Sequence, residues 1–375
     1  MSHPMMPEAT HDERAEQFFI RDLKIWLGEQ LDPLQRQLVE ATSASMPESD
    51  DMDIGPLRRK LLEHDAYRSW ISVRRTSQEM MWDAVGSSID RQLDALTAKA
   101  AVSQPRGSVT LNADFQPPRY IAALDVHMMP GGYAHDRGDG DIRQGALIDR
   151  GGAVYMLGRN GGLMNDVRGH TTVQHLFEVY PDLEPKRILD LGCAIGASTV
   201  AVASYFPDAQ VYGVDVGAAM LRYAHARAEH LGQRVHYVQA NAERTDFPDA
   251  SFDFVYSCVL LHETSKAATR KIFAECHRLL RPGGVVIHCE VPPMENLGTW
   301  GKVIGDFESL YNNEPFWRGV QTLDITAVMR DAGFTDVKRG FQAATPRASR
   351  DAGKGFTERS AGVFRSWLMI SARKS

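Results

Sequence analysis

Residues 187–199, RILDLGCAIGAST, decide the fold of this chain. An apolar strand runs into a turn that contains Gly192 and Gly196, and a helix-forming stretch, TVAVASYF, follows at once. Glycines in such a turn let a ligand approach the backbone, and the helix amino terminus offers free N–H groups. The G-x-G-x-x-G spacing of dinucleotide-binding folds is not met, because Ala194 and Ala197 occupy two of the glycine positions.

Two carboxylates accompany this turn. Asp190 would repel a pyrophosphate but can bind an ammonium group, so the turn favours a ligand with a positively charged head. Asp215 follows Gly196 by nineteen residues and ends the strand VYGVD, where a carboxylate can accept both hydroxyls of a ribose. The position alone equally allows Asp215 to cap the helix that follows.

Outward from this turn, apolar strands alternate with helical stretches. That alternation predicts a parallel sheet covered by helices on both faces. After the parallel strands, we expect a helix over residues 324–333, a strand over 335–341 and a final strand over 363–372. The expected parallel strands are RILDL, VYGVD, VHYVQ, FDFVYS and GVVIHCE.

Four ordered motifs, LDLGCAIG, VYGVDVG, FPDASFDFVYS and RLLRPGG, make residues 170–375 resemble the class I S-adenosylmethionine-dependent methyltransferases. The branch in question includes ubiquinone and menaquinone C-methyltransferases and many small-molecule O-methyltransferases. The resemblance implies an α/β, Rossmann-like seven-stranded sheet with a reversed final hairpin. It also implies that S-adenosylmethionine is the cofactor and a small molecule the acceptor.

The resemblance also assigns a cofactor site. It places Asp190, Gly192 and Gly196 at the methionine moiety, Asp215 at the ribose, and Val216 and Met220 beside the adenine. Asn241 stands where the family usually has an Asp, and its amide oxygen can still accept from the adenine amine, so we expect a weaker contact. The implied set is Asp190, Gly192, Cys193, Gly196, Asp215, Val216, Met220, Asn241, Ala242, Glu243 and Ser257.

A candidate base follows the strand FDFVYSCVLL. His262 would lie at the carboxyl edge of the sheet, where ligands bind in this class of fold. In the O-methyltransferases that the chain resembles, a His with an adjacent acidic residue at this position is the base. His262 and Glu263 match that pair, and Glu290 matches a carboxylate that orients the site. The alternative is that His262 is structural and Glu290 caps its strand.

Several reactions stay open at this point. Oxygen methylation with His262 as the general base is the first expectation, because a hydroxyl nucleophile must lose its proton. Carbon or sulfur methylation is the alternative, since an enolate or thiolate needs little help from a base. An alternative of another class is a non-catalytic assembly protein that keeps the methyltransferase fold.

An aromatic insertion follows residue 290. Its rings predict a lid over a planar or apolar acceptor, and the alternative is packing onto the sheet. The pocket would be completed from the other side by His127, Met128, Met129, Tyr133 and Tyr155, unless the methionines only fill the core. The expected acceptor-binding residues are Tyr133, Tyr155, Trp300, Phe307, Tyr311 and Trp317.

The chain ahead of residue 171 carries no motif of a named domain. Apolar residues at helical spacing predict a helical domain over residues 1–105, with a bend at Asp32-Pro33. Part of its apolar surface is expected to form a homodimer interface, and the alternative is core packing. Residues 106–170 form a predicted connector that caps the pocket. Because residues 131–169 hold 11 of the 31 glycines, we expect short strands and loops there and no long helix.

Metal, nucleic acid and membrane sites are not expected. Histidines and aspartates of the glycine-rich segment match neither a zinc site nor a calcium loop. The net charge of -6 gives no surplus for phosphates, and no apolar run is long enough to span a bilayer. The amino-terminal residues lack the pattern of a secretory signal, so a cytoplasmic location is expected. The residues weighed for a metal are His127, His135, Asp136, Asp139 and Asp141.

Overall fold

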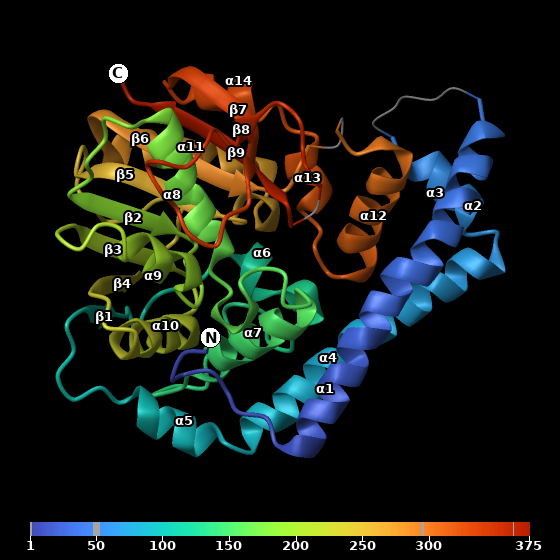
Figure 1. The fold of residues 1–375 in the computed structure, drawn as a ribbon, viewed down its shortest axis with the longest axis horizontal. Helices are drawn as coiled ribbons and strands as arrows, with labels where there is room; N and C mark the ends of the chain where they lie inside the picture. The colour runs from blue at the N-terminus through green and yellow to red at the C-terminus, as the bar shows by residue number, and fades with distance from the viewer. Residues whose placement is uncertain (1, 48–52, 294–295, 363) are drawn as a thin grey trace.

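The computed structural model describes residues 2–47, 53–293, 296–362 and 364–375. Its centre is a nine-stranded sheet in the order β1-β4-β3-β2-β5-β6-β9-β7-β8 (Figure 1). Neighbours from β1 to β6 pair in parallel, whereas β9 is antiparallel to both β6 and β7. The strands are β1 (Ser108–Thr110), β2 (Arg187–Leu191), β3 (Gln210–Asp215), β4 (Val235–Gln239), β5 (Phe252–Cys258), β6 (Leu280–Glu290), β7 (Thr335–Ala343), β8 (Phe356–Thr357) and β9 (Ser366–Arg373).

Seven neighbouring strands, β4-β3-β2-β5-β6-β9-β7, confirm the predicted seven-stranded sheet. The antiparallel strand β9 forms the predicted reversed hairpin with β7. The sheet gains an edge strand on each side, because β1 pairs with β4 and β8 pairs with β7. Val363, where we expected the last strand to begin, lies outside the described residues, and β9 begins at Ser366.

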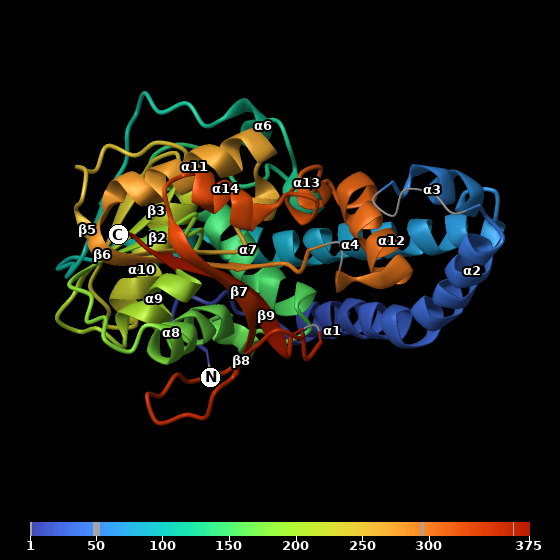
Figure 2. The same ribbon diagram turned by 90° about the horizontal axis from the view of Figure 1, so that it is seen from above.

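Helices cover both faces of the sheet (Figure 2). Alternate strand residues explain this arrangement, because Ile188 packs with α8, α9 and α10 while its neighbour Leu189 packs with α11 and α14. The α-helices of this carboxyl-terminal part are α8 (Val167–Val179), α9 (Ala197–Ala203), α10 (Ala218–His230), α11 (Lys266–Leu279), α12 (Gly298–Tyr311), α13 (Trp317–Gln321) and α14 (Ile325–Asp331).

The amino-terminal helices form an elongated arm beside the sheet domain (Figure 1). The predicted bend is a π-helical turn, η1 (Leu27–Leu31), which joins two α-helices just before Pro33, a residue without an N–H to donate. The α-helices ahead of the sheet are α1 (His11–Trp26), α2 (Asp32–Ala44), α3 (Gly55–Leu61), α4 (Asp65–Asp90), α5 (Leu93–Ala100), α6 (Arg119–Ala122) and α7 (Arg143–Tyr155). Short 3-10 turns are η2 (Val126–Met128), η3 (Gly162–Met164) and η4 (Leu261–Glu263).

Over residues 131–169 the expected loops occur at 131–142 and 156–161, but the expectation of short strands without a long helix was wrong. Residues 143–155 form helix α7, and no strand occurs in this described segment. Its glycines allow close packing: a Cβ at Gly145 would lie 2.2 Å from Tyr223 Cβ, and one at Gly151 would lie 2.2 Å from the Trp82 ring. The packing of α7 against α10 and α4 therefore outweighs the low helix propensity of glycine.

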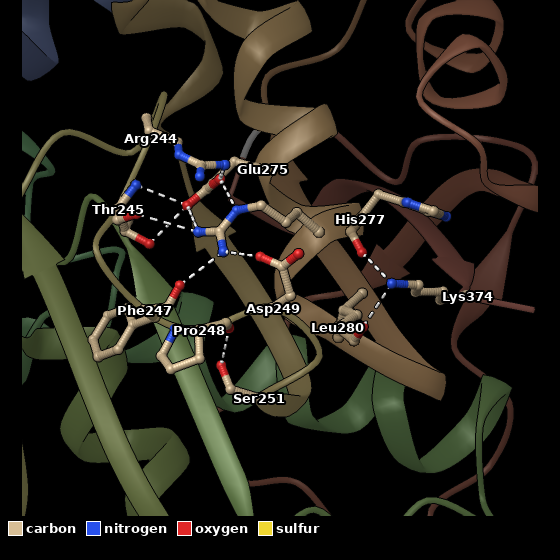
Figure 3. Close-up of polar contacts among 11 residues, drawn as sticks. Arg244, Thr245, Phe247, Pro248, Asp249, Ser251, Glu275, His277, Leu280 and Lys374 are labelled. Atoms are coloured by element: carbon tan, nitrogen blue, oxygen red, sulfur yellow. Dashed lines mark hydrogen bonds and ion pairs between the residues drawn. The ribbon is translucent and has the colours of Figure 1, made fainter.

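The loop after β4 is tied to α11 (Figure 3). The Glu275 carboxylate accepts hydrogen bonds from the backbone N–H and the hydroxyl of Thr245, both at 2.7 Å. Arg278 donates to Glu275, to Asp249 and to the carbonyl of Phe247. These charged hydrogen bonds fix the loop that leads from the predicted adenine side of the site into β5.

None of the helices in the described ranges is long and apolar enough to cross a membrane.

Candidate active site

A cavity of about 590 Å³ opens at the carboxyl ends of the parallel strands. Its floor comes from the ends of β2, β3, β5 and β6 and the turns after them. Its walls come from the connector, α7, α12 and α13. This is the position at which α/β sheets with a strand-order switch bind ligands.

Strand β2 carries a buried carboxylate near its carboxyl end, one oxygen of which has no hydrogen-bond partner in the described chain. Asp190 is 1% exposed, and its Oδ2 accepts a hydrogen bond of 2.6 Å from the Thr199 hydroxyl. Oδ1 has no hydrogen-bond partner among the described residues. Burial and the neighbouring Cys258 raise the pKa of Asp190 well above its usual value. A cationic donor placed in the cavity would satisfy this oxygen.

Asp215 closes the same turn from the end of β3. Its Oδ2 accepts from the backbone N–H of Ala194 and its Oδ1 from that of Gly217, each at 2.9 Å. The side chain therefore orders both the turn after β2 and the start of α10, and it also lines the cavity. Ala194 has a φ of 44°, a left-handed conformation that a glycine adopts without strain.

The predicted cofactor residues divide into two groups. Asp190, Gly192, Cys193, Asp215, Val216, Asn241 and Ala242 line the cavity. The four others, Gly196, Met220, Glu243 and Ser257, are not in its described lining. Gly196 lies beneath the turn, where a Cβ would be 2.2 Å from the Tyr237 hydroxyl, and Met220 is buried in the core.

The other two residues outside the lining have protein partners. Glu243 accepts from the Tyr120 hydroxyl at 2.9 Å and pairs with Lys271 at 2.8 Å. The Ser257 hydroxyl lies 2.8 Å from Nδ1 of His288, and both residues are fully buried. Both side chains are therefore held by protein partners outside the described lining of the cavity.

Arg168 is the only Lys or Arg among the described lining residues. It projects from α8, and its Nε is buried without a hydrogen-bond partner in the described chain. Its guanidinium also lies over the Trp367 ring, 5.6 Å from the centroid. An anionic group bound in the cavity would therefore pair with Arg168.

His262 and Glu290 form a buried pair on the cavity wall. Nδ1 of His262 lies 2.9 Å from Oε2 of Glu290, and the side chains are 4% and 1% exposed. The other Glu290 oxygen accepts from the backbone N–H of Leu261 at 2.5 Å. Burial opposes the charge on His262, but the carboxylates of Glu290 and Glu263 outweigh it and raise its pKa to about 10. Trp317 packs edge-on against the ring.

Glu263 points to a second histidine. Its Oε1 lies 3.2 Å from Nε2 of His127 and 3.5 Å from Nε2 of His262, and it accepts from the Tyr133 hydroxyl at 3.2 Å. Nδ1 of His127 lies 2.8 Å from Oε1 of Glu314. Burial disfavours the charge on Glu263, but His127 outweighs it and lowers the pKa of the carboxyl.

The predicted acceptor-binding aromatic residues also divide into two groups. Tyr133, Tyr155, Trp300 and Trp317 line the cavity, whereas Phe307 and Tyr311 are not in its described lining. Phe307 instead packs on Trp70 of the arm, with ring centroids 5.3 Å apart, and Tyr311 packs on Phe307. The insertion therefore both lines the cavity and attaches to the amino-terminal helices.

Sequence reasoning missed Glu314 and Arg168 as site residues, and it did not join His127 to any carboxylate outside the glycine-rich segment. His127 and Glu314 are 187 positions apart and meet only in the folded chain. Asp136 and Asp141 were weighed for a metal together with His127, but they have other partners. Asp136 accepts a hydrogen bond from Arg222, and Asp141 accepts from the backbone N–H groups of residues 137 and 143. Apolar neighbours in the sequence hint at burial only for His127, which lies between Val126 and Met128, because Glu314 follows two asparagines and Arg168 lies between Asp166 and His170.

Comparisons with known proteins match this chain to methyltransferases. Residues 188–284 match the model of a methyltransferase domain. An uncharacterized methyltransferase of Synechocystis is 32% identical over 158 residues, which cover 42% of this chain and 71% of the relative. A demethylmenaquinone methyltransferase of Thermus thermophilus is 36% identical over 109 residues, covering 29% of this chain and 49% of that protein. This chain therefore spans about half the length of the second relative.

A solved structure also aligns with the chain. Phosphoethanolamine N-methyltransferase 2 of Haemonchus contortus, in complex with S-adenosylhomocysteine, aligns with 22% sequence identity and a TM-score of 0.41. The alignment covers 54% of this chain and 52% of that one.

Proposed function

The chain belongs to the class I S-adenosylmethionine-dependent methyltransferases, and from this premise we propose that it methylates an oxygen atom of a small organic acceptor. The observation that carries the proposal is the buried pair of His262 and Glu290 on the wall of the cofactor cavity. S-adenosylmethionine, when bound, supplies a methyl group on a positively charged sulfur.

The residues of the cavity fit this cofactor. The free Oδ1 of Asp190 suits the amino group of its methionine part, and Arg168 suits the carboxylate. Asp215 at the end of β3 suits the ribose hydroxyls. The side chains of Val216 and Ala242 offer an apolar site for the adenine.

Proton transfer is the task of His262. In the proposed step, the acceptor hydroxyl gives its proton to Nε2 of His262, and its oxygen forms the new bond to the methyl carbon as the sulfur–methyl bond breaks. Glu290 holds Nδ1, which orients Nε2 and stabilises the imidazolium that results. The remaining task of the cavity is to hold the two reactants in line.

Carbon or sulfur methylation is the alternative. The likeness to a demethylmenaquinone methyltransferase supports it, because that relative's name describes methylation of a quinone precursor. An acceptor of this kind needs less help from His262, so a histidine variant distinguishes the two reactions.

The first experiment is calorimetric titration of S-adenosylmethionine and S-adenosylhomocysteine into the full chain. Micromolar binding would justify a screen of phenolic, hydroxy-acid and thiol acceptors, with methylated product detected by mass spectrometry. His262→Gln should then lower kcat at least tenfold with an oxygen acceptor. A smaller loss at every pH would remove the base, and no binding by folded protein would overturn the enzymatic proposal.

A homodimer through the amino-terminal arm is a further part of the proposal. Its support is the large apolar side chains that the arm exposes. The expected test is sedimentation of the wild type and of a Phe19→Ser, Trp26→Ser double variant, which should shift toward the monomer. The exposed set is Phe18, Phe19, Trp26, Leu34 and Val73.

A further inference from the structure

We propose that His127, Glu263 and Glu314 bind a divalent first-row transition-metal ion at the wall of the acceptor cavity. Each residue offers one ligand atom, and the three atoms lie within 4.8 Å of one another. Metal–ligand bonds of ~2.1 Å keep any two ligand atoms of one ion within ~4.2 Å, so atoms at the 4.8 Å limit must approach by about half an ångström or more. His127 meets Glu314 through Nδ1 and Glu263 through Nε2, so binding of the ion through one of these nitrogens also requires one carboxylate side chain to turn. One imidazole nitrogen and two carboxylates suit ions such as Mn²⁺ and Zn²⁺.

A separate observation points to a missing cation. Glu314 is 1% exposed, yet its Oε2 is buried without a hydrogen-bond partner in the part of the chain that the structure describes. Its Oε1 is already shared by His127 and by the side-chain amide of Asn312, at 2.8 and 2.7 Å. A buried carboxylate oxygen with no donor is costly unless a cation binds it.

The charges of the cluster support the same conclusion. Among the described residues, no Lys or Arg forms an ion pair with Glu263 or Glu314. Imidazolium groups at His127 and His262 together would balance only two of the three carboxylates Glu263, Glu290 and Glu314. A divalent ion on a neutral His127 would balance all three together with His262.

The backbone holds His127 in place for this role. His127 and Met128 have φ values of 56° and 58°, which non-glycine residues rarely adopt. The His127 carbonyl accepts from the side chains of Trp82 and Gln78 of α4 at 2.7 and 3.0 Å. The arm therefore maintains a strained turn that directs the imidazole to Glu263 and Glu314.

The ion would define the acceptor class. Three protein ligands leave coordination positions open, and His127 and Glu263 both line the cavity. An acceptor with two neighbouring oxygens, such as a vicinal diol or a hydroxy acid, could occupy two of them. This consequence rests on the proposed function, because His262 next to Glu263 would receive the hydroxyl proton. Binding of the ion itself does not rest on it.

The test measures binding of Mn²⁺ alone to full-length protein that has been dialysed against EDTA. We expect one Mn²⁺ per chain, detected as the loss of the free-ion signal in electron paramagnetic resonance. Glu314→Gln and His127→Gln should weaken binding at least tenfold. His135→Gln, which changes an exposed histidine of the same segment, should leave it unchanged. Undiminished binding to Glu314→Gln, or none to the wild type, would overturn the site.

A second measurement uses only the wild type, so it tests the site even if a variant does not fold. Pulsed paramagnetic resonance of bound Mn²⁺ in the wild type should show the nitrogen coupling of a directly bound imidazole. A spectrum with oxygen ligands alone would overturn the site. S-adenosylmethionine titrated into the EDTA-treated protein tests the cofactor site separately. Full methyl transfer in EDTA would overturn the role of the ion in acceptor binding and leave the proposed function standing.

Discussion

Nδ1 of His262 lies 2.9 Å from Oε2 of Glu290, and both side chains are almost completely buried. The histidine comes from the turn after β5 and the glutamate from the last residue of β6, two neighbouring parallel strands. The hydrogen bond between them turns Nε2 toward Oε1 of Glu263, 3.5 Å away, and an acceptor hydroxyl would take the place of this second contact. A rigid sheet edge therefore fixes the orientation of the proposed base.

His262→Gln is expected to lower kcat by about 100-fold or more with an oxygen acceptor, because a positioned general base contributes on the order of 10²–10⁴. Cofactor affinity, measured by calorimetry, should change little, since the proposed cofactor contacts lie on β2, β3 and the loop after β4. A matched loss of cofactor affinity would instead indicate a structural role for His262.

Glu290→Gln should change the pH dependence as well as the rate. The carboxylate helps to raise the pKa of His262 to about 10, so the neutral imidazole that can accept a proton becomes more abundant as the pH rises. Loss of the carboxylate should lower this pKa and move the rise in kcat/KM to lower pH. The measurement is kcat/KM from pH 6 to 10, and an unmoved profile would contradict the positioning role.

Asp215→Asn should weaken S-adenosylmethionine binding about tenfold or more, because hydrogen bonds to a charged group contribute about 1.5–3 kcal/mol. Asparagine keeps the size of the side chain and one acceptor for the turn. Calorimetry measures the affinity, and Asp208→Asn, at an exposed position before β3, is the control. Equal affinities in both variants would assign Asp215 to capping alone.

The sequence predicted the parts of the molecule that depend on contiguous residues. The strands were readable because buried parallel strands are continuous apolar runs, and His262 follows one of them directly. The cluster of His127 and Glu314 was not readable, since the two residues meet only through tertiary folding. Helix α7 was missed for a related reason: the Trp82 ring that requires Gly151 lies on a helix far away in the sequence.

Gly151→Ala is expected to destabilise the chain by about 1–3 kcal/mol, although alanine has the higher helix propensity. The new Cβ would lie 2.2 Å from the ring of Trp82, which itself donates to the His127 carbonyl. Urea unfolding measures the loss. Gly353→Ala, where a Cβ meets nothing within 4 Å, is the control and should be near neutral. Similar values for the two variants would contradict the packing account of α7.

Acid sensitivity should come in part from His175, which is fully buried between β7 and β9. Its ring nitrogens lie 3.2 Å from Gln342 Oε1 and 2.9 Å from the Ser371 hydroxyl. Burial lowers its pKa from 6.5 to about 4, so the folded state keeps the ring neutral while the unfolded chain binds a proton below pH 6.5. The stability that this residue contributes is therefore complete above pH 6.5 and is lost as the pH falls toward 4.

When the pH falls from 7.5 to 5, His175 should lower the free energy of unfolding by about 2 kcal/mol. His175→Gln, which cannot titrate, should lose that much less stability over the same interval, whatever its stability at pH 7.5. Urea unfolding of both proteins at the two pH values measures the difference. His135→Gln, at an exposed position, should lose as much as the wild type. Parallel losses in wild type and His175→Gln would show that His175 is not kept neutral by its burial.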